Sequence, residues 1–484
     1  MSAPPGLKGL VLQAELLVSA STTGHIATTE QCLQRLVLGG IAVMILVEAR
    51  TAEAAVQQQN LFDQQHLPEG VSIVTTQPRL LATCLRAAAI KMSLDASVVA
   101  FVTLETRQAA AACKLAGLQL IATPQHVNSS QQLQQLLRHV ADSHRRRVTA
   151  ALLVGYTMKP SRERNLASRG LLPLTAPHGV CFVPVDFGQP LEQQGPFDVM
   201  LHKATDELIS RGPKQLPEFS ARIASLAAYT EANPETVLVD SLDKVHQVID
   251  RQTLTMCLEE AARAARAQGF AVQTPPSIQA NRLGPDAETR HLLAQSGIRL
   301  PCIVKPRVAC GTPEAHQMAV VLQEDGFQDL QVAMPGCLQQ FINHNGVLHK
   351  VYVMGDQMHV AERQSIPNLP AVATQAAGLP QVFAFDSLKS LPHRDYLQPH
   401  YESQQQPAGS GLNMEVVRVV TDELRKRMGL TLFGYDTVVQ ENTGVHFIID
   451  VNYFPSYKEF PDAAKALSDV LKKAFHTQRS QQQL

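Results

Sequence analysis

Three oxygen-bearing residues near the C-terminal end of the sequence could hold a metal ion. Alternation of apolar and polar residues in LTLFGYDTVV predicts a strand that carries Asp436, and alternation in HFIIDVNYF predicts a second strand with His446, Ile448, Asp450 and Asn452 on one face. Both segments are largely apolar, which favours a buried strand pair over a solvated one. The two strands would then hold their polar side chains in the interior.

The turn between these strands predicts how the acids pair. With a loop of the five residues Glu441–Val445, Gln440 lies opposite His446 and Asp436 lies opposite Asp450. Facing carboxylates repel each other unless a cation lies between them, and two Asp with one Asn form an oxygen ligand set suited to Mg²⁺ with bound phosphate. The alternative is a solvated hairpin face.

Composition excludes several classes of protein. The 484 residues are 45% hydrophobic and 18% charged, as in a soluble globular protein with two to four domains. Lys plus Arg number 42 and Asp plus Glu 43, so a polyanionic ligand must be held by a local cluster. A nucleic acid partner is not indicated.

Cysteine usage and hydropathy indicate the compartment. The eight cysteines form no CxxC pair and no zinc-ligand spacing, which is typical of reduced thiols. No segment approaches the roughly 18 apolar residues of a membrane span, and Gln13 and Glu15 interrupt the one N-terminal apolar stretch. We expect a monomer in the cytoplasm, with the nucleus as a second compartment, and no membrane partner.

Cationic residues follow several predicted strands. Lys159 follows a strand in ALLVGYTMK, Lys203 follows one in FDVMLHK, and Lys305 closes the apolar strand LPCIVK. An anionic ligand at the strand ends would explain them, although a solvated helix start explains each charge taken alone. There is no GxxxxGK[ST] and no GxGxxG, so neither a P-loop nor a Rossmann cradle is present.

The middle of the chain predicts the elements around these cations. Arg251 begins a long helix, and a hairpin turning at Gly355-Asp356 carries Lys350. Residues 364–412 are rich in Pro, Gln and Ser and predict a long irregular segment. A helix over Asn413–Met428, ended by Gly429, precedes the acidic hairpin.

The N-terminal part alternates between strands and helices over residues 8–123, which indicates a parallel sheet. Its segments VLQAELLV and VTLETRQAAAACKLAG resemble two motifs of the haloacid dehalogenase-like phosphatases. In this comparison Gln13 replaces the nucleophilic Asp, Glu15 the acid/base Asp, and Glu105 and Ala109 two metal ligands. Because an amide does not accept phosphate as a carboxylate does, the resemblance implies an inactive domain. An unrelated α/β domain is the alternative.

The remaining motifs resemble one kinase family. GYTMKPSR, DVMLHKATDE, VIDRQT, IVKPRVACGT, QQFINHNGVLHKVYVMGD, LFGYDTVV and IIDVNYFPSYKE occur in the order found in the inositol tris/tetrakisphosphate kinase family, over residues 148 to about 475. With the extra N-terminal domain and FDSLKSLP, the chain is similar to the plant subgroup numbered four. The resemblance implies an α/β fold, with an ATP-grasp kinase core preceded by a doubly wound dehalogenase-like domain.

The resemblance also implies a domain division. We expect a dehalogenase-like domain followed by three parts of the kinase, namely its N-terminal lobe, a central ATP-grasp subdomain and a C-terminal subdomain with the metal hairpin. The expected ranges are 1–147, 148–245, 246–341 and 342–477. The Gln-rich residues 124–147 are expected to form a boundary helix and linker.

Site residues are carried over by position from the family motifs. The resemblance implies a substrate set of Lys159, Lys203, His316, Lys350 and Asn452. It implies nucleotide contacts at Arg251, Lys305, Gln339, Lys350, Ser365 and Ser387, with the segment from Gln339 to Lys350 covering the adenine. It implies Mg²⁺ ligands at Asp436, Asp450 and Asn452.

The implied activity is transfer of the γ-phosphoryl group of ATP to a hydroxyl of an inositol tris- or tetrakisphosphate, with two Mg²⁺ ions and no dedicated general base. An ATP-grasp carboxylate–amine ligase is the alternative, although it gives no reason for the clustered lysines. Cys310 stands where the family often has His, and Ser456 where it often has Gly. Both departures lie in motifs near the expected inositol phosphate.

Overall fold

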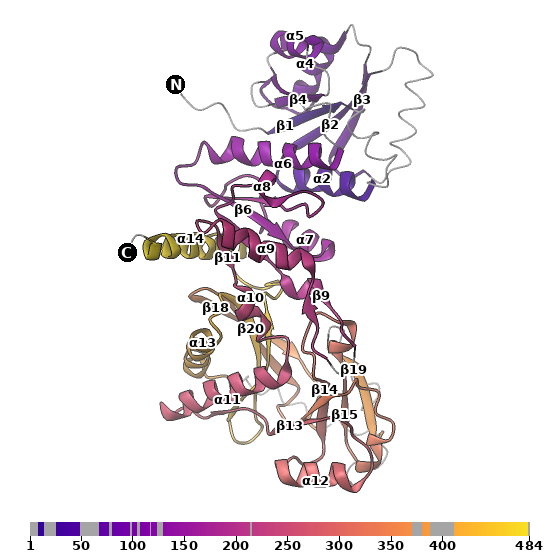
Figure 1. Ribbon diagram of the computed structural model, residues 1–484, viewed down its shortest axis with the longest axis vertical. Helices are drawn as coiled ribbons and strands as arrows, with labels where there is room; N and C mark the ends of the chain where they lie inside the picture. Colours follow the sequence, from indigo (N-terminus) through magenta and orange to yellow (C-terminus); the bar gives the residue numbers. More distant parts are fainter. Residues whose placement is uncertain are drawn as a thin grey trace. The chain divides into compact units, whose positions relative to one another are not determined.

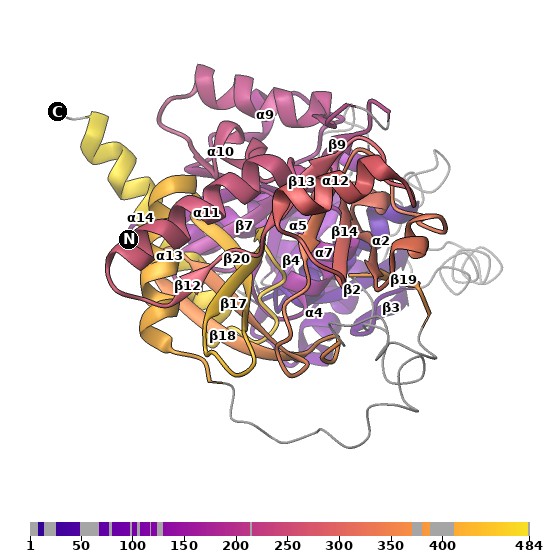
Figure 2. The same cartoon turned by 90° about the horizontal axis from the view of Figure 1, so that it is seen from below.

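A computed structural model gives the fold of the protein in two compact units (Figures 1 and 2). Unit 1 comprises residues 1–201, 229–238 and 464–484, and unit 2 comprises residues 202–228 and 239–463. The structure describes residues 8–13, 26–48, 67–76, 80–96, 99–103, 107–116, 118–122, 129–212, 215–369, 380–387 and 411–482. Among these residues, no helix is both long enough and apolar enough to cross a membrane.

Unit 1 contains a five-stranded parallel sheet in the order β3-β2-β1-β4-β5. All five residues of the central strand β1 are buried, as expected for a parallel sheet covered on both faces. The strands are β1 (Gly9–Gln13), β2 (Ala42–Glu48), β3 (Val71–Thr76), β4 (Val99–Thr103) and β5 (Gln119–Ala122). Only β3 was not predicted, because its sequence VSIVTT lacks a continuous apolar run and it forms a half-buried edge strand.

Helices cover the two faces of this sheet. In Figure 1, α4 and α5 lie on one face and α2 and α6 on the other. The core between the sheet and α4 and α5 includes Phe101, Leu85 and Ala112. The helices are α2 (Ile26–Leu38), α4 (Leu81–Lys91), α5 (Arg107–Ala116) and α6 (Ser129–Arg145).

The expected boundary helix is present as α6, and it is packed against neighbouring elements. It contacts α2 as well as β6 and β7, the first two strands of a second sheet. Its residues Leu137, Val140 and Ala141 are buried, and Arg138 donates a hydrogen bond of 2.7 Å to the carbonyl of Gln194. Apolar residues recur at every third or fourth position of this Gln-rich helix, so they form one side of it, and that side is buried.

The second sheet has the order β11-β8-β6-β7. Its strands are β6 (Leu152–Thr157), β7 (Val180–Pro184), β8 (Val199–His202) and β11 (Val237–Val239). Unit 1 also contains α7 (Pro160–Ala167), α8 (Leu191–Gln194) and nearly all of α14 (Ala463–Gln482). Helix α9 (Ala221–Ala232) is divided between the two units, and α10 (Leu242–His246) belongs to unit 2. Arg35 of α2 forms two hydrogen bonds with Glu163 of α7, which links the helices of the two sheets within unit 1.

Unit 2 is built on two five-stranded sheets, in the orders β13-β16-β14-β15-β19 and β12-β21-β20-β17-β18. The first contains β13 (Ser277–Ala280), β14 (Cys302–Pro306), β15 (Gln317–Val321), β16 (Gly336–Gln340) and β19 (Val382–Asp386). The second contains β12 (Val272–Gln273), β17 (Val347–Met354), β18 (Gln357–Gln364), β20 (Leu432–Val439) and β21 (His446–Tyr453). A small hairpin of β9 (Leu208–Ile209) and β10 (Glu218–Phe219) precedes them.

Each sheet of unit 2 has its own helices. Helix α12 (Ala287–Ser296) packs on the first sheet through Leu293, in a core with Val304 and Leu338. Helices α11 (Arg251–Ala267) and α13 (Met414–Met428) lie side by side over the second sheet (Figures 1 and 2). Three short 3₁₀ helices complete the described elements, η3 (Ala204–Glu207), η4 (Pro313–His316) and η5 (Glu324–Phe327).

Most predicted elements of unit 2 are confirmed. Helix α13 has Asn413 as its N-cap, accepting a hydrogen bond of 2.8 Å from the backbone of Glu415, and ends at Gly429 with φ of 63°. The predicted irregular segment contains a strand, β19, which pairs with β15. This strand was missed because its five residues stand between stretches rich in Pro, Gln and Ser.

Candidate active site

The hairpin of β20 and β21 brings two carboxylates opposite each other. Asp436 pairs with Asp450, and Gly434 pairs with Asn452. The predicted pairing of Gln440 with His446 is wrong, because Val439 pairs with His446 and the register shifts after Asp436.

This irregularity explains one wrong and one correct prediction. Ile449 lies between the paired residues of β21 and has no partner in the register, as the extra residue of a β-bulge does. The bulge moves His446 and Ile448 to the opposite face from Asp450, contrary to the prediction from alternation. It also restores the facing pair of acids, although the loop is one residue longer than predicted.

Lys350 on the neighbouring strand β17 approaches the acidic pair. It pairs with Asp436 in the sheet, and its Nζ lies 3.6 Å from Oδ1 of Asp436. Burial raises the pKa of Asp436, while Lys350 opposes that rise and Asp450 adds to it. The carboxylate of Asp436 in turn raises the pKa of Lys350. Charge at this point is therefore only partly balanced within the protein.

One buried carboxylate oxygen of the acidic pair accepts no hydrogen bond from the described residues. Oδ1 of Asp436 is buried and, apart from its ion pair with Lys350 at 3.6 Å, accepts no hydrogen bond within the part of the chain that the structure describes. Such an atom is costly unless a ligand completes its coordination. Among the described residues no group of three or more His, Cys, Asp or Glu has the arrangement of a metal site. A Mg²⁺ ion here would therefore combine the two carboxylates with the Asn452 amide and oxygens of a ligand, as Mg²⁺ commonly does.

Lys305 reaches the hairpin from the end of β14. It is 6% exposed, and its Nζ donates a hydrogen bond of 3.2 Å to the carbonyl of Ile449, the bulge residue. Burial lowers the pKa of Lys305, and Asp450 opposes that change. A buried ammonium beside a carboxylate can bind an anion that is bridged to the same carboxylate by a metal ion.

Arg251 at the start of α11 holds the loop that follows β14. Its guanidinium donates to the carbonyl of Val308 at 2.9 Å, to that of Ala315 at 3.2 Å, and to that of Pro306. Nε is buried and makes no hydrogen bond to the described residues. Burial lowers the pKa of Arg251, with Asp450 acting in the opposite direction. Arg251 therefore shapes the loop and adds positive charge near Asp450.

A cleft joins these charged residues to apolar ones. Its cavity volume is only about 20 Å³, within about 340 Å³ of empty space that includes the open mouth. Arg251, Lys305 and Asp450 line its charged part, and the rest of the lining is Leu254, Thr255, Leu258, Thr274, Cys337, Gln339, Ile448 and Ile449. The cleft is therefore apolar along much of its wall and charged at one part.

Lys203 lies directly after β8 and contacts the end of the hairpin. Its Nζ donates a hydrogen bond to the carbonyl of Tyr453 and lies 5.0 Å from the centre of the Tyr453 ring. The charges of Lys203 and Arg251 lower the pKa of the Cys310 thiol, but burial has the larger effect and raises it to about 11. At neutral pH, Cys310 is therefore a protonated thiol beside cations.

Three buried residues in this region were missed by sequence reasoning. Nε2 of His202 lies 2.7 Å from the carbonyl of Asp240, and the Tyr453 hydroxyl accepts from the backbone N–H of Asp240 at 3.1 Å and donates to the carbonyl of His202 at 3.0 Å. The Asp240 carboxylate accepts from the backbone N–H of Thr431 at 2.9 Å and of Leu432 at 3.1 Å. This network ties the residue before Lys203 to both strands of the acidic hairpin. The sequence signal that could have identified this network is a His at the end of an apolar strand.

The other predicted residues occupy two further places. Nδ1 of His316 lies 3.1 Å from the Ser387 hydroxyl, so these two form a pair at the ends of β15 and β19. Ser365 follows β18, and its hydroxyl lies 2.8 Å from Nε2 of His344. Lys159 belongs to unit 1, where it is the N-cap of α7, and it is described there apart from the residues of unit 2.

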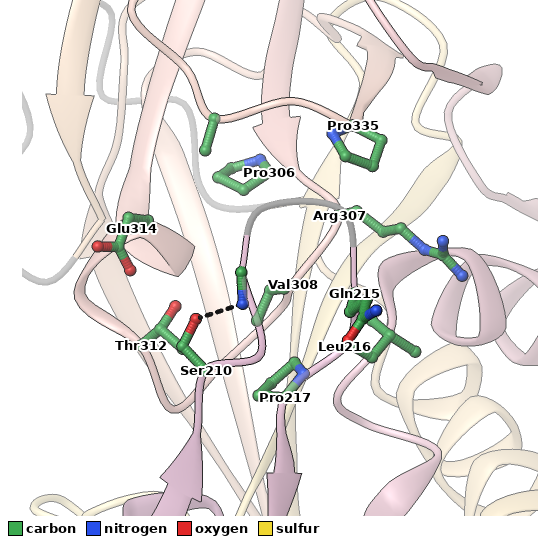
Figure 3. Close-up of a pocket in the computed structure, with 12 residues that line it drawn as sticks. Ser210, Gln215, Leu216, Pro217, Pro306, Arg307, Val308, Thr312, Glu314 and Pro335 are labelled. Atoms are coloured by element: carbon green, nitrogen blue, oxygen red, sulfur yellow. Dashed lines mark hydrogen bonds between the residues drawn. The ribbon is translucent and has the colours of Figure 1, made fainter.

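A second, larger cleft borders the same loop on the side of the β9–β10 hairpin. Figure 3 shows Pro306, Val308 and Pro217 around it, with Ser210 accepting a hydrogen bond of 3.3 Å from Gly212. Its empty volume, including open solvent, is about 740 Å³. It contains none of the predicted site residues. The chemistry of the acidic hairpin therefore lies at the smaller cleft.

Comparison with known proteins gives matches over most of unit 2 and part of unit 1. The sequence profile of the inositol 1,3,4-trisphosphate 5/6-kinase ATP-grasp domain matches residues 268–473. The profile of the inositol 1,3,4-trisphosphate 5/6-kinase pre-ATP-grasp domain matches residues 153–245. Neither match includes the five-stranded parallel sheet of unit 1.

Individual relatives agree with the profiles. Inositol-tetrakisphosphate 1-kinase 6 of Oryza sativa subsp. indica is 32% identical over 371 residues, which cover 72% of this chain and 65% of that protein. Inositol-tetrakisphosphate 1-kinase of Danio rerio is 32% identical over 317 residues, which cover 64% of this chain and 75% of that protein. This chain thus spans 65% of the length of the rice relative. Among solved structures, D-alanine–D-alanine ligase of Bacillus anthracis aligns over 69% of this chain and 100% of that chain, with a TM-score of 0.41 and 12% identity.

Proposed function

Because this chain belongs to the inositol 1,3,4-trisphosphate 5/6-kinase family of ATP-grasp proteins, we propose that it is an ATP-dependent inositol phosphate kinase. It transfers the γ-phosphoryl group of ATP to a hydroxyl of an inositol tris- or tetrakisphosphate. The observation that carries the proposal is the facing pair Asp436 and Asp450, with Lys305 and Lys350 beside it.

The acidic hairpin would hold the metal. Asp436, Asp450 and Asn452 supply three oxygen ligands, and the buried unsatisfied Oδ1 of Asp436 supports this assignment. When held by these residues, Mg²⁺, for which we propose two ions, would neutralise negative charge that develops during transfer. The protein's own part is to hold the acids opposite each other and to keep Lys305 and Arg251 near them.

The smaller cleft would hold the nucleotide. Lys305 and Arg251 lie where the phosphates would be, and the adenine is assigned to the segment from Gln339 to Lys350 by resemblance to the family. Gln339, Lys350, Ser365 and Ser387 are proposed as further nucleotide contacts by resemblance to the family.

The inositol phosphate would bind where cations approach the metal hairpin from outside the nucleotide cleft. We assign this role to Lys203, His316, Lys350 and Asn452, and to Lys159 by resemblance to the family alone. Lys203 sits against Tyr453, the residue after Asn452, which supports its place beside the metal. Cys310 would lie near the substrate and, as a neutral thiol, would give a weaker phosphate contact than a charged side chain. No group acts as a dedicated base, because positioning and charge neutralisation carry phosphoryl transfer.

For residues 1–147 we propose an inactive relative of the haloacid dehalogenase-like phosphatases, as in the plant subgroup numbered four. The parallel sheet with β1 at its centre supports this proposal, as does Gln13 at the end of β1. The Gln13 side chain is buried and accepts a hydrogen bond from Thr103. Ala109 is buried in α5, while Glu15 and Glu105 lie outside the described residues. The ranges 148–245, 246–341 and 342–477 remain the proposed kinase subdomains.

We also propose a monomer of the cytoplasm and nucleus without a nucleic acid or membrane partner. The eight cysteines are free thiols, which supports a reducing compartment.

A carboxylate–amine ligase would share the metal hairpin and the nucleotide cleft. It would release free phosphate in the presence of an amine acceptor, whereas a kinase leaves the phosphoryl group on the inositol phosphate. The clustered lysines favour the kinase.

One experiment tests the proposal. The full chain is incubated with Mg²⁺, ATP and a panel of inositol tris- and tetrakisphosphates, and the products are separated by charge. We expect ADP in equal amount to a product with one more phosphate. Release of free phosphate that depends on an amine, with no new inositol phosphate, would establish the ligase instead.

A further inference from the structure

The outer face of α4 and α5, which cover one side of the N-terminal sheet (Figure 1), carries strongly exposed apolar side chains. Ile90 of α4 is 72% exposed and Leu115 of α5 is 67% exposed, more than any other large hydrophobic residue that the structure describes. Arg86 links the two, because its guanidinium donates a hydrogen bond to the carbonyl of Leu115 and it stands one helical turn before Ile90. Single exposed apolar residues are common, whereas neighbouring ones indicate a place of contact.

Small side chains occupy much of the same face. Ala87 of α4 and Ala110 and Ala111 of α5 are exposed, and the two helices contact each other. Because a methyl group projects little from a helix, the backbone of a partner could approach both helices closely. Ile90 and Leu115 would then be the large side chains that the partner buries.

The charge of this face has one sign. Lys91 and Lys114, the sequence neighbours of the two apolar residues, are exposed and form no ion pair with a residue that the structure describes. Helices α4 and α5 contain no Asp or Glu, and Asp95 is the one acid in the described parts of residues 80–116. A face with cations and so few acids is complementary to an acidic partner.

The same features argue against other partners. Two copies of this chain joined symmetrically through the face would bring like charges together. An anionic lipid surface attracts lysines, but two large apolar side chains bury too little area for stable insertion. The backbone of a nucleic acid would leave both apolar side chains without an apolar partner. A protein segment with acidic and apolar side chains satisfies both the charge and the apolar pair.

We infer that the outer face of α4 and α5 is a docking surface for an acidic amphipathic helix of a partner protein. Apolar residues of that helix pack on Ile90 and Leu115, and its carboxylates pair with Lys91 and Lys114. This role needs no phosphatase chemistry in the first domain. It also does not depend on the proposed kinase function.

Binding of defined peptides to the full chain tests the inference. The probe is a fluorescent helical peptide of about 20 residues, with Leu one turn apart on one face and Glu on both sides of that face. The comparison peptide has Lys in place of every Glu. Fluorescence anisotropy at low ionic strength measures both affinities. We expect the acidic peptide to bind at least about tenfold more tightly than the basic one, and to bind more weakly as salt is added.

Two double variants separate the charges from the apolar contact. Lys91→Glu with Lys114→Glu should weaken binding of the acidic peptide at least about tenfold and should strengthen binding of the basic peptide. Ile90→Ser with Leu115→Ser leaves the charge unchanged and should weaken binding of the acidic peptide at least about fivefold. All four side chains are exposed, so both variants should keep the circular dichroism and melting temperature of the wild type.

Matched controls carry the same changes elsewhere on the chain. Lys426→Glu with Lys473→Glu alters the net charge equally at exposed positions of α13 and α14. Ile209→Ser with Met256→Ser removes two other exposed apolar side chains. Both controls should bind the acidic peptide within about twofold of the wild type.

Four results would overturn the inference. The first is wild-type binding of the two peptides with equal affinity or not at all, and the second is unchanged binding of the acidic peptide by either variant of the α4 and α5 face. The third is binding to phosphatidylserine vesicles, lost on charge reversal, by a chain that does not bind the acidic peptide. The fourth is a dimer in sedimentation that Ile90→Ser with Leu115→Ser dissociates. Phosphoryl transfer should stay at the wild-type level in every variant, and a wild-type chain without transfer would contradict the proposed function alone.

Discussion

Asp436 and Asp450 are the central residues of the site, because each lies beside cations that balance its negative charge only in part. Lys350 lies 3.6 Å from Asp436, and Asp450 interacts with buried Lys305 and Arg251. A group of two acids and three cations within one buried region is costly to assemble for stability alone. We interpret it as a site prepared for a metal ion and phosphates.

A prediction at this scale separates substrate from nucleotide contacts. Lys203→Ala and His316→Ala should each raise the KM for the inositol phosphate at least about fivefold, since each removes a charge-assisted hydrogen bond from the substrate. The KM for ATP should change less than about twofold. Steady-state kinetics with each substrate varied in turn measures both, with exposed Lys426→Ala of α13 as the control. Loss of ATP affinity with intact inositol phosphate affinity would reverse the proposed orientation.

At the scale of elements, the β-bulge of β21 and the network of His202, Asp240 and Tyr453 place the acidic hairpin. The bulge sets which residues share a face with Asp450, and the network fixes both strands to the residue before Lys203. His202 is completely buried between Asp240 and the backbone of Ala204, and burial lowers its pKa to about 4.

The network predicts a specific dependence of stability on pH. The pKa of His202 is lower in the folded state than its ordinary value of 6.5, so the unfolded chain binds a proton first as the pH falls. Its contribution to stability is complete above pH 6.5 and is lost progressively towards pH 4. At pH 5 the loss should be about 2 kcal/mol.

His202→Asn tests this contribution. The Asn carbonyl can still accept from Ala204, but the donor to Asp240 is lost, so the variant should be about 1–3 kcal/mol less stable at pH 7. Because Asn does not titrate, the free energy of unfolding of the wild type should fall by about 2 kcal/mol relative to that of the variant between pH 7 and pH 5. Urea unfolding at both pH values measures it. An unchanged difference would show that His202 does not titrate in this way.

Sequence patterns predicted elements well where one periodicity extends over a whole segment. Helix α13 was predicted over Asn413–Met428 with its end at Gly429, and the facing acids were predicted from alternation together with an assumed five-residue loop. The bulge at Ile449 could not be predicted, because it depends on the pairing of the whole hairpin and not on its local sequence. Asp240 was missed for a similar reason, since it meets Thr431 only in the folded protein. Strands β3 and β19 were too short or too polar to stand out.

At the scale of the whole molecule, unit 1 contains both the N-terminal sheet and the second sheet. Helix α6 contacts α2, β6 and β7, and Arg35 of α2 is hydrogen-bonded to Glu163, which also accepts a hydrogen bond of 2.7 Å from the Tyr156 hydroxyl. The Gln-rich composition predicted a boundary helix and linker over residues 124–147, and the helix is present over Ser129–Arg145. Its packing against α2, β6 and β7 could not be predicted from composition.

This packing predicts the effect of removing the first domain. A chain of residues 148–484 lacks α6 and Arg35, so apolar residues of β7 become exposed and Glu163 loses its cation. We expect a melting temperature at least about 5 °C below that of the full chain. Differential scanning calorimetry of both chains measures it, and a chain of residues 129–484, which retains α6, should recover part of the loss. Equal melting temperatures of the full chain and of residues 148–484 would show that the first 147 residues do not stabilise the rest of the chain.

The most direct test of the account is transfer of radiolabelled γ-phosphate from ATP to the inositol phosphate used by the wild-type chain, compared between wild type and Asp450→Asn. Asp325→Asn, which changes an exposed acid in η5, is the matched control. We predict that Asp450→Asn remains folded by circular dichroism and loses transfer at least about 10²-fold, because metal binding and stabilisation of the transferred charge are lost together. The control should retain full activity. Mg²⁺-dependent transfer at the wild-type rate by a folded Asp450→Asn chain would contradict the assignment of the acidic hairpin as the active site.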